Sequence, residues 1–384
     1  MTTIVDVARL AGVSTATVSR VLNANARVDP DLAARVRRAI DELAYRPSRA
    51  ARTLRTQQSR VWALLVPDVR NPHFTEIVRG IEDVAYQAGY SLLLCNTDED
   101  SAKEQTYLEL ALAERVTGII LAPTHPPASA IKEVLAEKVA IVTVDRRLGE
   151  AELDTVLVNN VAGAEQAVEH LLDGGYRRIA CISGPLDTTT GRERLFGFRV
   201  ALERRGVAVA SRLVRIGDFH EPSGRKEMEQ LLRMKEPPDA VLVANNLMTL
   251  GALDAVTSVG LDVPGDIAIV GFDDALWNAL VRPPLTSVAQ PTYDLGRETA
   301  RLLLSRIDGY TGPAREVTLA PTLRVRASSL PRAMAHDNGP VPPGPGGSET
   351  RRRGPARLRS GTQRTAVSGD GPGSRRARPR APRP

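Results

Sequence analysis

The chain has 384 residues, a formal net charge of +6 and a mean hydropathy of −0.18, and it is long enough for two or three domains with sizeable cores. Its cysteines, Cys95 and Cys181, lie inside apolar runs, which predicts buried free thiols in a reducing compartment rather than disulfides in a secreted protein. The N-terminus lacks the apolar stretch of a signal peptide, and no run approaches the ~20 apolar residues of a membrane span. We therefore expect a cytoplasmic protein with no membrane partner.

The charge is distributed unevenly along the chain. Residues 1–60 contain 11 Arg, no Lys and five acidic residues, a net charge of +6. Residues 331–384 contain 12 Arg and three acidic residues, a net charge of +9, which leaves −9 for residues 61–330. The two basic ends are therefore candidates for contact with polyanions such as DNA, whereas the acidic middle is not.

Three short helices are predicted in residues 1–47. Thr3 starts a capping box, and Gly12 ends the first helix. Ser14 caps a second helix over residues 15–22, and Asp29-Pro30 begins a third. A basic three-helix unit of this kind predicts a helix-turn-helix DNA-binding head, although these residues alone also fit a helical hairpin in another small domain.

The outward face of the second helix favours nucleic acid. Short hydroxyl side chains at a helix N-terminus suit phosphate oxygens, and Arg20, one turn later, can pair with a guanine edge. By contrast, we expect Arg35, Arg37 and Arg38 of the third helix to form a solvated face.

Residues 48–60 are predicted to form a hinge helix and linker. The segment SRAARTLR, residues 48–55, is too short to stay helical alone, because isolated helices below about 12 residues rarely persist in water. We expect this helix to fold only when a partner holds it, and the alternative is a plain interdomain linker.

Residues 61–330 alternate between continuous apolar strands and segments with helical periodicity. This pattern is typical of parallel α/β sheets covered on both faces, and the length favours two such sheets. The predicted strands are 62–67, 91–96, 118–123, 140–145, 155–160, 178–183, 240–245 and 267–274. Residues 331–384 are rich in Pro, Gly and Arg, and we expect a disordered tail.

Polar side chains follow the predicted strands where each strand ends. Ligands of parallel sheets bind outside these carboxyl ends. The residues are Asp68, Asn96, Thr124, Asp145, Asn245, Asp273 and Asp274. Such carboxylates and amides, with an arginine and an aromatic residue, suit a polyhydroxylated ligand such as a sugar.

No enzyme signature competes with this interpretation. The chain has no Walker lysine loop and no GxGxxG after its first strand, and its five His residues lack metal-ligand spacing. We expect neither catalysis nor a metal or other cofactor.

At the head the residues also resemble a known family. The segment VARLAGVSTATVSRVLN, followed by AYRP and AARTLR and later by GFDD, is similar to the LacI/GalR family of bacterial transcription regulators. The resemblance extends to about residue 330. It implies an all-α head with a hinge helix, a periplasmic-binding-protein-like α/β core of two parallel-sheet subdomains, and a homodimer on a pseudo-palindromic double-stranded operator.

The resemblance also implies the DNA contacts. It implies that bases in the major groove are read by Thr15, Ala16 and Arg20. It also implies that DNA phosphates are held by Ser14, Thr17, Ser19 and Asn23. In the hinge helix, Ala51 allows two helices to approach each other, and Leu54 is the residue that inserts into the minor groove.

For the effector, the resemblance suggests an aromatic residue, several hydrogen-bonding or wall positions, and one residue near the crossover between subdomains. These are Phe74, then Asp145, Arg192, Phe219, Asn245 and Asp274, and finally Gln290. The expected subdomains are residues 61–160 with 291–320, and residues 161–290 with 321–330. Asn246 departs from the family pattern, which often has Asp at that position.

Together these features predict a transcriptional repressor whose operator affinity is controlled by a small effector, with a sugar as the first candidate. A purine or another metabolite, acting as inducer or co-repressor, is the main alternative. A periplasmic sugar-binding protein and a sugar-processing α/β enzyme are rival classes. The Arg-rich tail is either a neutral extension or a source of non-specific DNA affinity.

Overall fold

The computed structural model describes residues 2–22, 28–45, 59–124, 128–149 and 152–331. The predicted hinge helix (residues 48–55) and the predicted tail beyond residue 331 lie outside these described residues, as do Asn23, Ala51 and Leu54. Within the described residues, no helix is long and apolar enough to cross a membrane.

The head consists of α1 (Ile4–Ala11), α2 (Thr15–Leu22) and α3 (Pro30–Glu42). Its small core is centred on Val7, Val18 and Val36, one from each helix, and all three are fully buried. The predicted caps are confirmed. Thr3 forms a capping box with Asp6, Gly12 adopts a left-handed conformation after α1, and Asp29 accepts backbone N–H bonds at the start of α3.

Arg35 is exposed, as expected, but it also makes a specific contact. Its Nη2 donates a 2.6 Å hydrogen bond to the carbonyl oxygen of Ala11, in the last turn of α1. Because a helix leaves its last carbonyl groups without partners, this bond satisfies one of them and attaches α3 to the turn before α2. Arg37 and Arg38 are exposed, as expected.

Two six-stranded sheets form the rest of the described chain. The first has the order β11-β5-β4-β3-β1-β2, with all neighbours parallel. Its strands are β1 (Val61–Val66), β2 (Ser91–Asn96), β3 (Gly118–Leu121), β4 (Ala140–Val144), β5 (Asp154–Val158) and β11 (Glu316–Leu319). We call this sheet with its covering helices the first subdomain.

The second sheet has the order β12-β10-β9-β8-β6-β7, and only the β10–β12 pair is antiparallel. Its strands are β6 (Ile179–Ser183), β7 (Val214–Ile216), β8 (Ala240–Val243), β9 (Ala268–Phe272), β10 (Thr286–Ala289) and β12 (Thr322–Arg324). We call this sheet with its helices the second subdomain. The eight predicted strands are all present to within two residues at either end, whereas the short β7, β10, β11 and β12 were not predicted.

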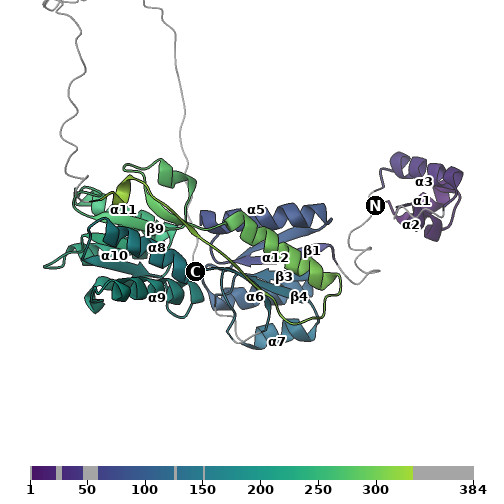
Figure 1. Cartoon of the computed structure of the whole chain (residues 1–384). Coiled ribbons are helices and arrows are strands. Elements are labelled where there is room, and N and C mark those ends of the chain that lie inside the picture. Colours follow the sequence, from purple (N-terminus) through teal and green to yellow (C-terminus); the bar gives the residue numbers. More distant parts are fainter. Residues whose placement is uncertain (1, 23–27, 46–58, 125–127, 150–151, 332–384) are drawn as a thin grey trace, which may run out of the picture. The chain divides into compact units, whose positions relative to one another are not determined.

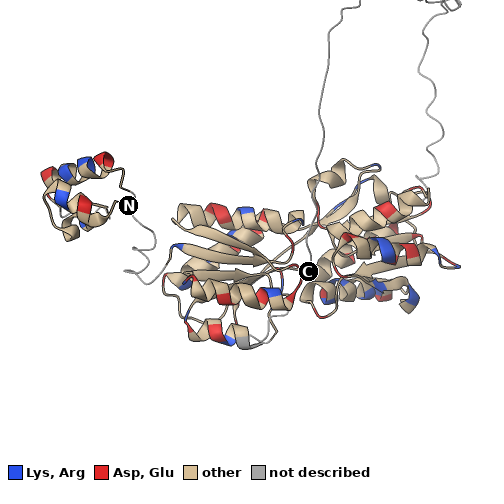
Figure 2. Cartoon of the chain, turned by 180° about the vertical axis from the view of Figure 1, so that it is seen from behind, with Lys and Arg blue, Asp and Glu red and all other residues tan. Residues whose placement is uncertain are grey.

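Helices cover both faces of each sheet (Figure 1). In the first subdomain these are α5 (Pro72–Gln87) with α12 (Thr292–Ile307) on one face, and α6 (Ser101–Ala113) with α7 (Ala128–Ala136) on the other. In the second subdomain, α8 (Asn160–Asp173) and α9 (Thr189–Arg204) cover one face, and α10 (Glu221–Leu232) and α11 (Asn246–Ser258) cover the other. Apart from Asp154 at the start of β5, the inner strands carry no charged residue, and the charges gather on helices and loops (Figure 2), because strands buried on both faces are mostly apolar.

The chain passes between the two sheets three times. It leaves the first sheet after β5, returns to α12 after β10, and passes from β11 to β12 near its end. These crossings bring the carboxyl ends of strands from both sheets to one boundary, where the candidate site lies.

Candidate functional site

The first candidate site is the outward face of α2. Thr15, Ala16 and Arg20 are exposed, whereas Val18 points into the core of the head. Ser14 caps the helix, since its Oγ accepts a 3.2 Å bond from the backbone N–H of Thr17. A helix that is anchored by its inner face and exposes an Arg on its outer face can enter a major groove. Thr17 and Ser19 are half-buried at the edge of this face, and the predicted DNA contacts stay predictions.

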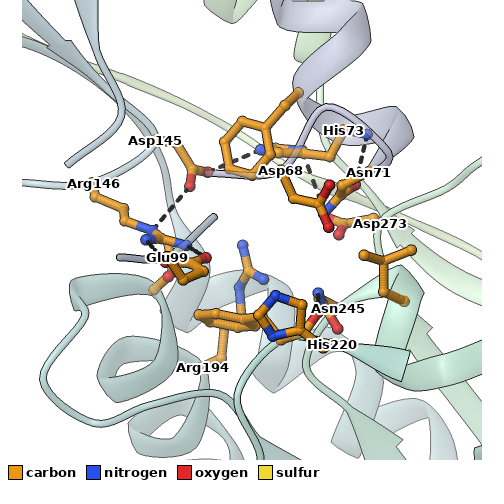
Figure 3. A pocket seen from close by; sticks show the side chains of 14 residues that line it. Asp68, Asn71, His73, Glu99, Asp145, Arg146, Arg194, His220, Asn245 and Asp273 are labelled. Atoms are coloured by element: carbon orange, nitrogen blue, oxygen red, sulfur yellow. Dashed lines mark hydrogen bonds and ion pairs between the residues drawn. The ribbon is translucent and has the colours of Figure 1, made fainter. Parts of the chain in front are cut away.

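The second candidate site is a cavity of about 20 Å³ between the two subdomains (Figure 3). It has room for about one water molecule, so a sugar-sized ligand requires the subdomains to move apart. Both subdomains contribute to its lining. The lining residues are Asp68, Asn71, His73, Phe74, Glu99, Asp145, Arg146, Thr190, Arg194, Phe219, His220, Asn245, Leu247 and Asp273.

Four of the predicted effector residues line this cavity, namely Phe74, Asp145, Phe219 and Asn245. Two of them, Asp145 and Asn245, follow from the rule that polar groups gather at strand ends, since they lie just after β4 and β8. Phe74 and Phe219 were implied by the family resemblance. Asn245 is held in place by donating a 2.8 Å bond to the carbonyl of Phe219.

Arg192, which was predicted to face the effector, lies outside the cavity. Its side chain is exposed, and its Nη1 donates to the carbonyl of Leu186 at 3.2 Å. Arg194 lines the cavity instead. Positions two apart on a helix are rotated by about 200° from each other, so only one of the two arginines can face the cleft.

Arg194 is fixed by three contacts beside the cavity. Its Nε donates to Asn160 Oδ1 at 2.8 Å, its Nη1 donates to the carbonyl of Ala244 at 2.6 Å, and its guanidinium carbon lies 3.9 Å from the centre of the Phe272 ring. Burial lowers the pKa of Arg194, and the charges of Asp273 and Asp145 oppose this shift. Arginine has five N–H donors, so donors remain for a ligand after these bonds.

Asp274 and Gln290 also lie outside this cavity, contrary to prediction. Asp274 pairs with Arg324 and Arg326, both at 2.7 Å, and Asp273 is the carboxylate that lines the cleft. Asp273 has φ = 76°, so the chain turns sharply at the end of β9 and sends the two neighbouring side chains in different directions. Asp274 and Gln290 line a separate cavity of about 470 Å³, which shares His73 and Asp273 with the effector cavity.

Arg146 is the second arginine that lines the cavity. It is buried and binds both carboxylate oxygens of Glu99, at 2.7 and 2.6 Å. Burial alone would lower its pKa, but the attraction of Glu99 and then Asp145 raises it. The same guanidinium lies 5.3 Å from the centre of the Phe219 ring. Arg146 therefore lies beside both a carboxylate and an aromatic ring of the cavity.

His73 occupies the boundary between the subdomains. Its Nε2 lies 3.0 Å from Asp145 Oδ1 in the first subdomain, and its Nδ1 lies 3.7 Å from Asp273 Oδ1 in the second. Burial would raise the pKa of Asp145, but the charge and hydrogen bond of His73, followed by Arg146 and Arg194, lower it to about 2. No sequence pattern gave His73 a role. Its position directly after Asn71-Pro72, at the start of α5, was the feature from which a place near the strand ends could have been predicted.

Several cavity residues adopt unfavourable backbone conformations. Asp145, Phe219 and Asp273 have φ values of 68°, 69° and 76°, in the left-handed region that favours glycine. Strain of this kind costs about 1–3 kcal/mol at each position and is often retained at binding sites. Within the described residues, no group of three or more His, Cys, Asp or Glu is arranged to hold a metal ion.

Comparisons with known proteins match both the head and the α/β core of the chain. Residues 3–48 match the model of bacterial regulatory proteins of the lacI family, and residues 168–329 match a periplasmic binding protein-like domain. The ribose operon repressor of Escherichia coli K12 is 38% identical over 333 residues, which are 86% of this chain and 100% of that protein.

Two solved structures are similar over most of the chain. The transcriptional regulator CelR–cellobiose complex is 36% identical with a TM-score of 0.66, over 85% of this chain and 100% of that chain. The lac repressor dimer bound to operator and an anti-inducer is 31% identical with a TM-score of 0.76, over 86% of this chain and 99% of that chain. With this extent of identity, and with a matching head and effector core, the chain belongs to the LacI family of bacterial regulatory proteins and is a DNA-binding transcriptional regulator rather than an enzyme.

Proposed function

We propose that this protein is a dimeric repressor of a sugar-utilisation operon and that its effector is a neutral monosaccharide, with ribose as the first candidate. The observation that carries the proposal is the cavity between the subdomains, which combines carboxylates, amides, guanidiniums and two phenyl rings. A sugar hydroxyl both donates and accepts hydrogen bonds, so it matches a wall that offers both kinds of partner.

The charges of the cavity favour a neutral ligand over a sugar phosphate. Four carboxylates line it, namely those of Asp68, Glu99, Asp145 and Asp273, against two arginines. Arg146 is already paired with Glu99 at 2.6 Å. A phosphate would therefore lie against the carboxylates of Asp145 and Asp273 and find one of the two guanidiniums that line the cavity already occupied.

The size of the cavity favours a monosaccharide over a disaccharide. Any ligand must enlarge the 20 Å³ cavity by separating the subdomains, and a smaller ligand requires less separation. The 38% identity to a ribose operon repressor points to the same ligand size. A nucleobase is the second candidate, because Phe74 and Phe219 line the cavity from opposite subdomains and could enclose a flat ring.

The DNA-binding part of the proposal rests on α2 and on two-fold symmetry. Two heads that read half-sites of a pseudo-palindrome require a dimer, and the similar lac repressor structure is a dimer on its operator. Effector binding would change the angle between the subdomains and thereby the spacing of the two heads. A coupling free energy of about 1–3 kcal/mol changes DNA affinity 5- to 150-fold.

A thermal-unfolding screen tests the effector. The purified protein is heated with d-ribose, cellobiose, d-ribose 5-phosphate or adenine, and a ligand at 100 times its Kd adds about 2.7 kcal/mol of stability. We expect d-ribose to raise the unfolding temperature, Arg194→Ala to abolish this rise, and the matched exposed variant Arg192→Ala to retain it. A response to the phosphorylated sugar alone would contradict the proposal.

DNA binding is then measured with sites selected from a random DNA pool. We expect d-ribose to change the affinity at least 5-fold, and the direction of the change distinguishes an inducer from a co-repressor. Equal affinity with and without a ligand that binds the protein would contradict effector control.

A further inference from the structure

His73 contacts acidic groups of both subdomains at once. It is the second residue of α5, and its side chain is only 4% exposed. Nε2 faces Asp145 Oδ1 at 3.0 Å, and Nδ1 faces Asp273 Oδ1 at 3.7 Å. The two carboxylates are 128 positions apart in the sequence and follow strands of different sheets, so the ring bridges the boundary along which the subdomains must move.

The remaining groups around His73 leave its position acidic. Asp68 and Glu99 add negative charge from the loops after β1 and β2, while Arg146 after β4 and Arg194 on α9 add positive charge. Asp68 is paired with Arg70 at 3.0 Å, and Glu99 is paired with Arg146 at 2.6 Å. Arg194 opposes protonation of the ring, but it is one positive charge against the two carboxylates of Asp145 and Asp273. The positive charge of a protonated imidazole would therefore partly balance the carboxylates of Asp145 and Asp273.

The side-chain amide of Gln290 contacts both Asp273 and the ring of His73. Its Nε2 donates to Asp273 Oδ1 at 2.5 Å and lies 3.4 Å from His73 Nδ1. The amide is thus bound more closely to the carboxylate than to the ring. An N–H at Nδ1 would place the charge of the ring 3.7 Å from the same Asp273 oxygen. In a neutral ring that donates from Nε2, Nδ1 would instead accept an N–H of Gln290, and Asp273 would lose the charge of the ring.

We propose that protonated His73 is the positioning residue of the effector site, a clasp that holds Asp145 of the first subdomain to Asp273 of the second. When the proton is present, each carboxylate has one oxygen directed to the ring, and the two subdomains attract each other. When it is lost, two carboxylates face each other across the boundary with less positive charge between them. Closure of the cleft then becomes less favourable.

The direction of the titration agrees with this geometry. Burial would lower the pKa of His73, but the charges of Asp145 and Asp273 and the hydrogen bond to Asp145 raise it above its ordinary value of 6.5. A histidine with a raised pKa in the folded protein stabilises that fold fully below its unfolded pKa, and the contribution is lost as the pH rises through the folded pKa. The clasp is therefore expected to hold below pH 6.5 and to weaken as the pH rises through the raised pKa of His73.

An NMR titration of the imidazole groups in the full chain tests the clasp directly. We expect the His73 resonance, identified by its absence in His73→Gln, to titrate above pH 6.5 in the wild-type protein. Asp273→Asn, in the other subdomain, should lower this pKa by about one unit or more. The matched variant Asp274→Asn removes the neighbouring carboxylate, which pairs with Arg324 and Arg326 instead, and should leave the pKa of His73 unchanged.

Thermal unfolding between pH 6 and pH 9 provides a second measurement. The wild-type protein should lose stability over this range, and His73→Gln should lose less. His170→Gln is the control, because His170 contacts Ser329 at 2.8 Å within the second subdomain and burial lowers its pKa. Because its pKa is lowered, His170 affects stability only near and below pH 6.5, so above about pH 7.5 the profile of His170→Gln should follow that of the wild type.

Two results would overturn the proposal. The first is a wild-type His73 that titrates at or below 6.5, and the second is a His73 pKa that Asp273→Asn does not change. The proposal rests on the proposed function only in treating the cavity as the effector site. Because none of these measurements uses an effector, the clasp can fail while ribose binding is demonstrated, and the reverse also holds.

Discussion

The side-chain nitrogen of Asn246 donates a 2.9 Å hydrogen bond to Asn71 Oδ1, and this bond connects the start of α11 in the second subdomain to the start of α5 in the first. Asn71 Oδ1 also accepts from the backbone N–H of His73 at 2.9 Å, which fixes it as an acceptor. Asn246 must therefore act as a donor. This explains why an amide, which has N–H donors, suits this position.

Asn246→Asp is expected to weaken the contact between the subdomains. A carboxylate would face the acceptor Asn71 Oδ1 and add a negative charge close to Asp273, whose Oδ2 accepts from the backbone N–H of residue 246 at 3.3 Å. Loss of the bond and the unfavourable contact should cost about 1–3 kcal/mol at pH 8, measured by thermal unfolding. The deficit should shrink at pH 5, where a proton restores the donor. Asn246→Ala, which loses the bond without adding charge, should show a smaller deficit at pH 8 and no such recovery.

Arg20→Ala is expected to reduce DNA specificity. Arg20 is exposed on α2, and a bidentate contact to a guanine is worth about 1–3 kcal/mol of discrimination. Fluorescence anisotropy with a selected site and with unrelated DNA should show a larger loss on the selected site. Arg37→Ala, on the exposed face of α3, is the control and should weaken both DNAs to a similar small extent. Equal losses on both DNAs for Arg20→Ala would remove its role in base recognition.

Gly184→Ala is expected to disturb the aromatic wall of the effector cavity. A Cβ atom at residue 184 would overlap the ring of Phe219, which is buried with a strained backbone. Overpacking of this kind costs about 1–3 kcal/mol, and the displaced ring should weaken d-ribose binding in a calorimetric titration. The double variant with Phe219→Leu should recover stability relative to Gly184→Ala alone. If the two changes were additive, the ring would not be the source of the strain.

Glu104→Gln is expected to stabilise the protein above neutral pH. Glu104 is fully buried on α6, and burial raises its pKa to about 7, against the lowering effect of a hydrogen bond from the backbone N–H of Thr124. Because the folded protein binds this proton more tightly than the unfolded chain, the free energy of unfolding falls as the pH rises from about 4.5 to about 7.

Removing this charge should therefore flatten the pH profile between these values and add up to about 3 kcal/mol at pH 8, as measured by denaturant unfolding. Glu109→Gln, an exposed position on the same helix, should leave the profile unchanged. A profile that keeps its wild-type slope in Glu104→Gln would show that Glu104 ionises normally.

The local features of the fold could be predicted from the sequence. The helices of the head begin and end at Thr3, Gly12, Ser14 and Asp29, because capping depends on residues only a few positions apart. The central strands were predicted because burial on both faces requires continuous apolar runs. Asp145 and Asn245 were predicted as cavity residues because each lies within two residues of the end of such a strand.

Side-chain direction and long-range pairing required the tertiary structure. The choice of Arg194 over Arg192 depends on the rotation of α9 about its axis, and the choice of Asp273 over Asp274 depends on the turn after β9. The sequence by itself determined that a DNA-binding head precedes two parallel sheets with polar strand ends. Only the tertiary structure placed His73 between two carboxylates that lie 72 and 200 positions away, because contacts between distant segments are set by how the sheets pack and not by any local pattern.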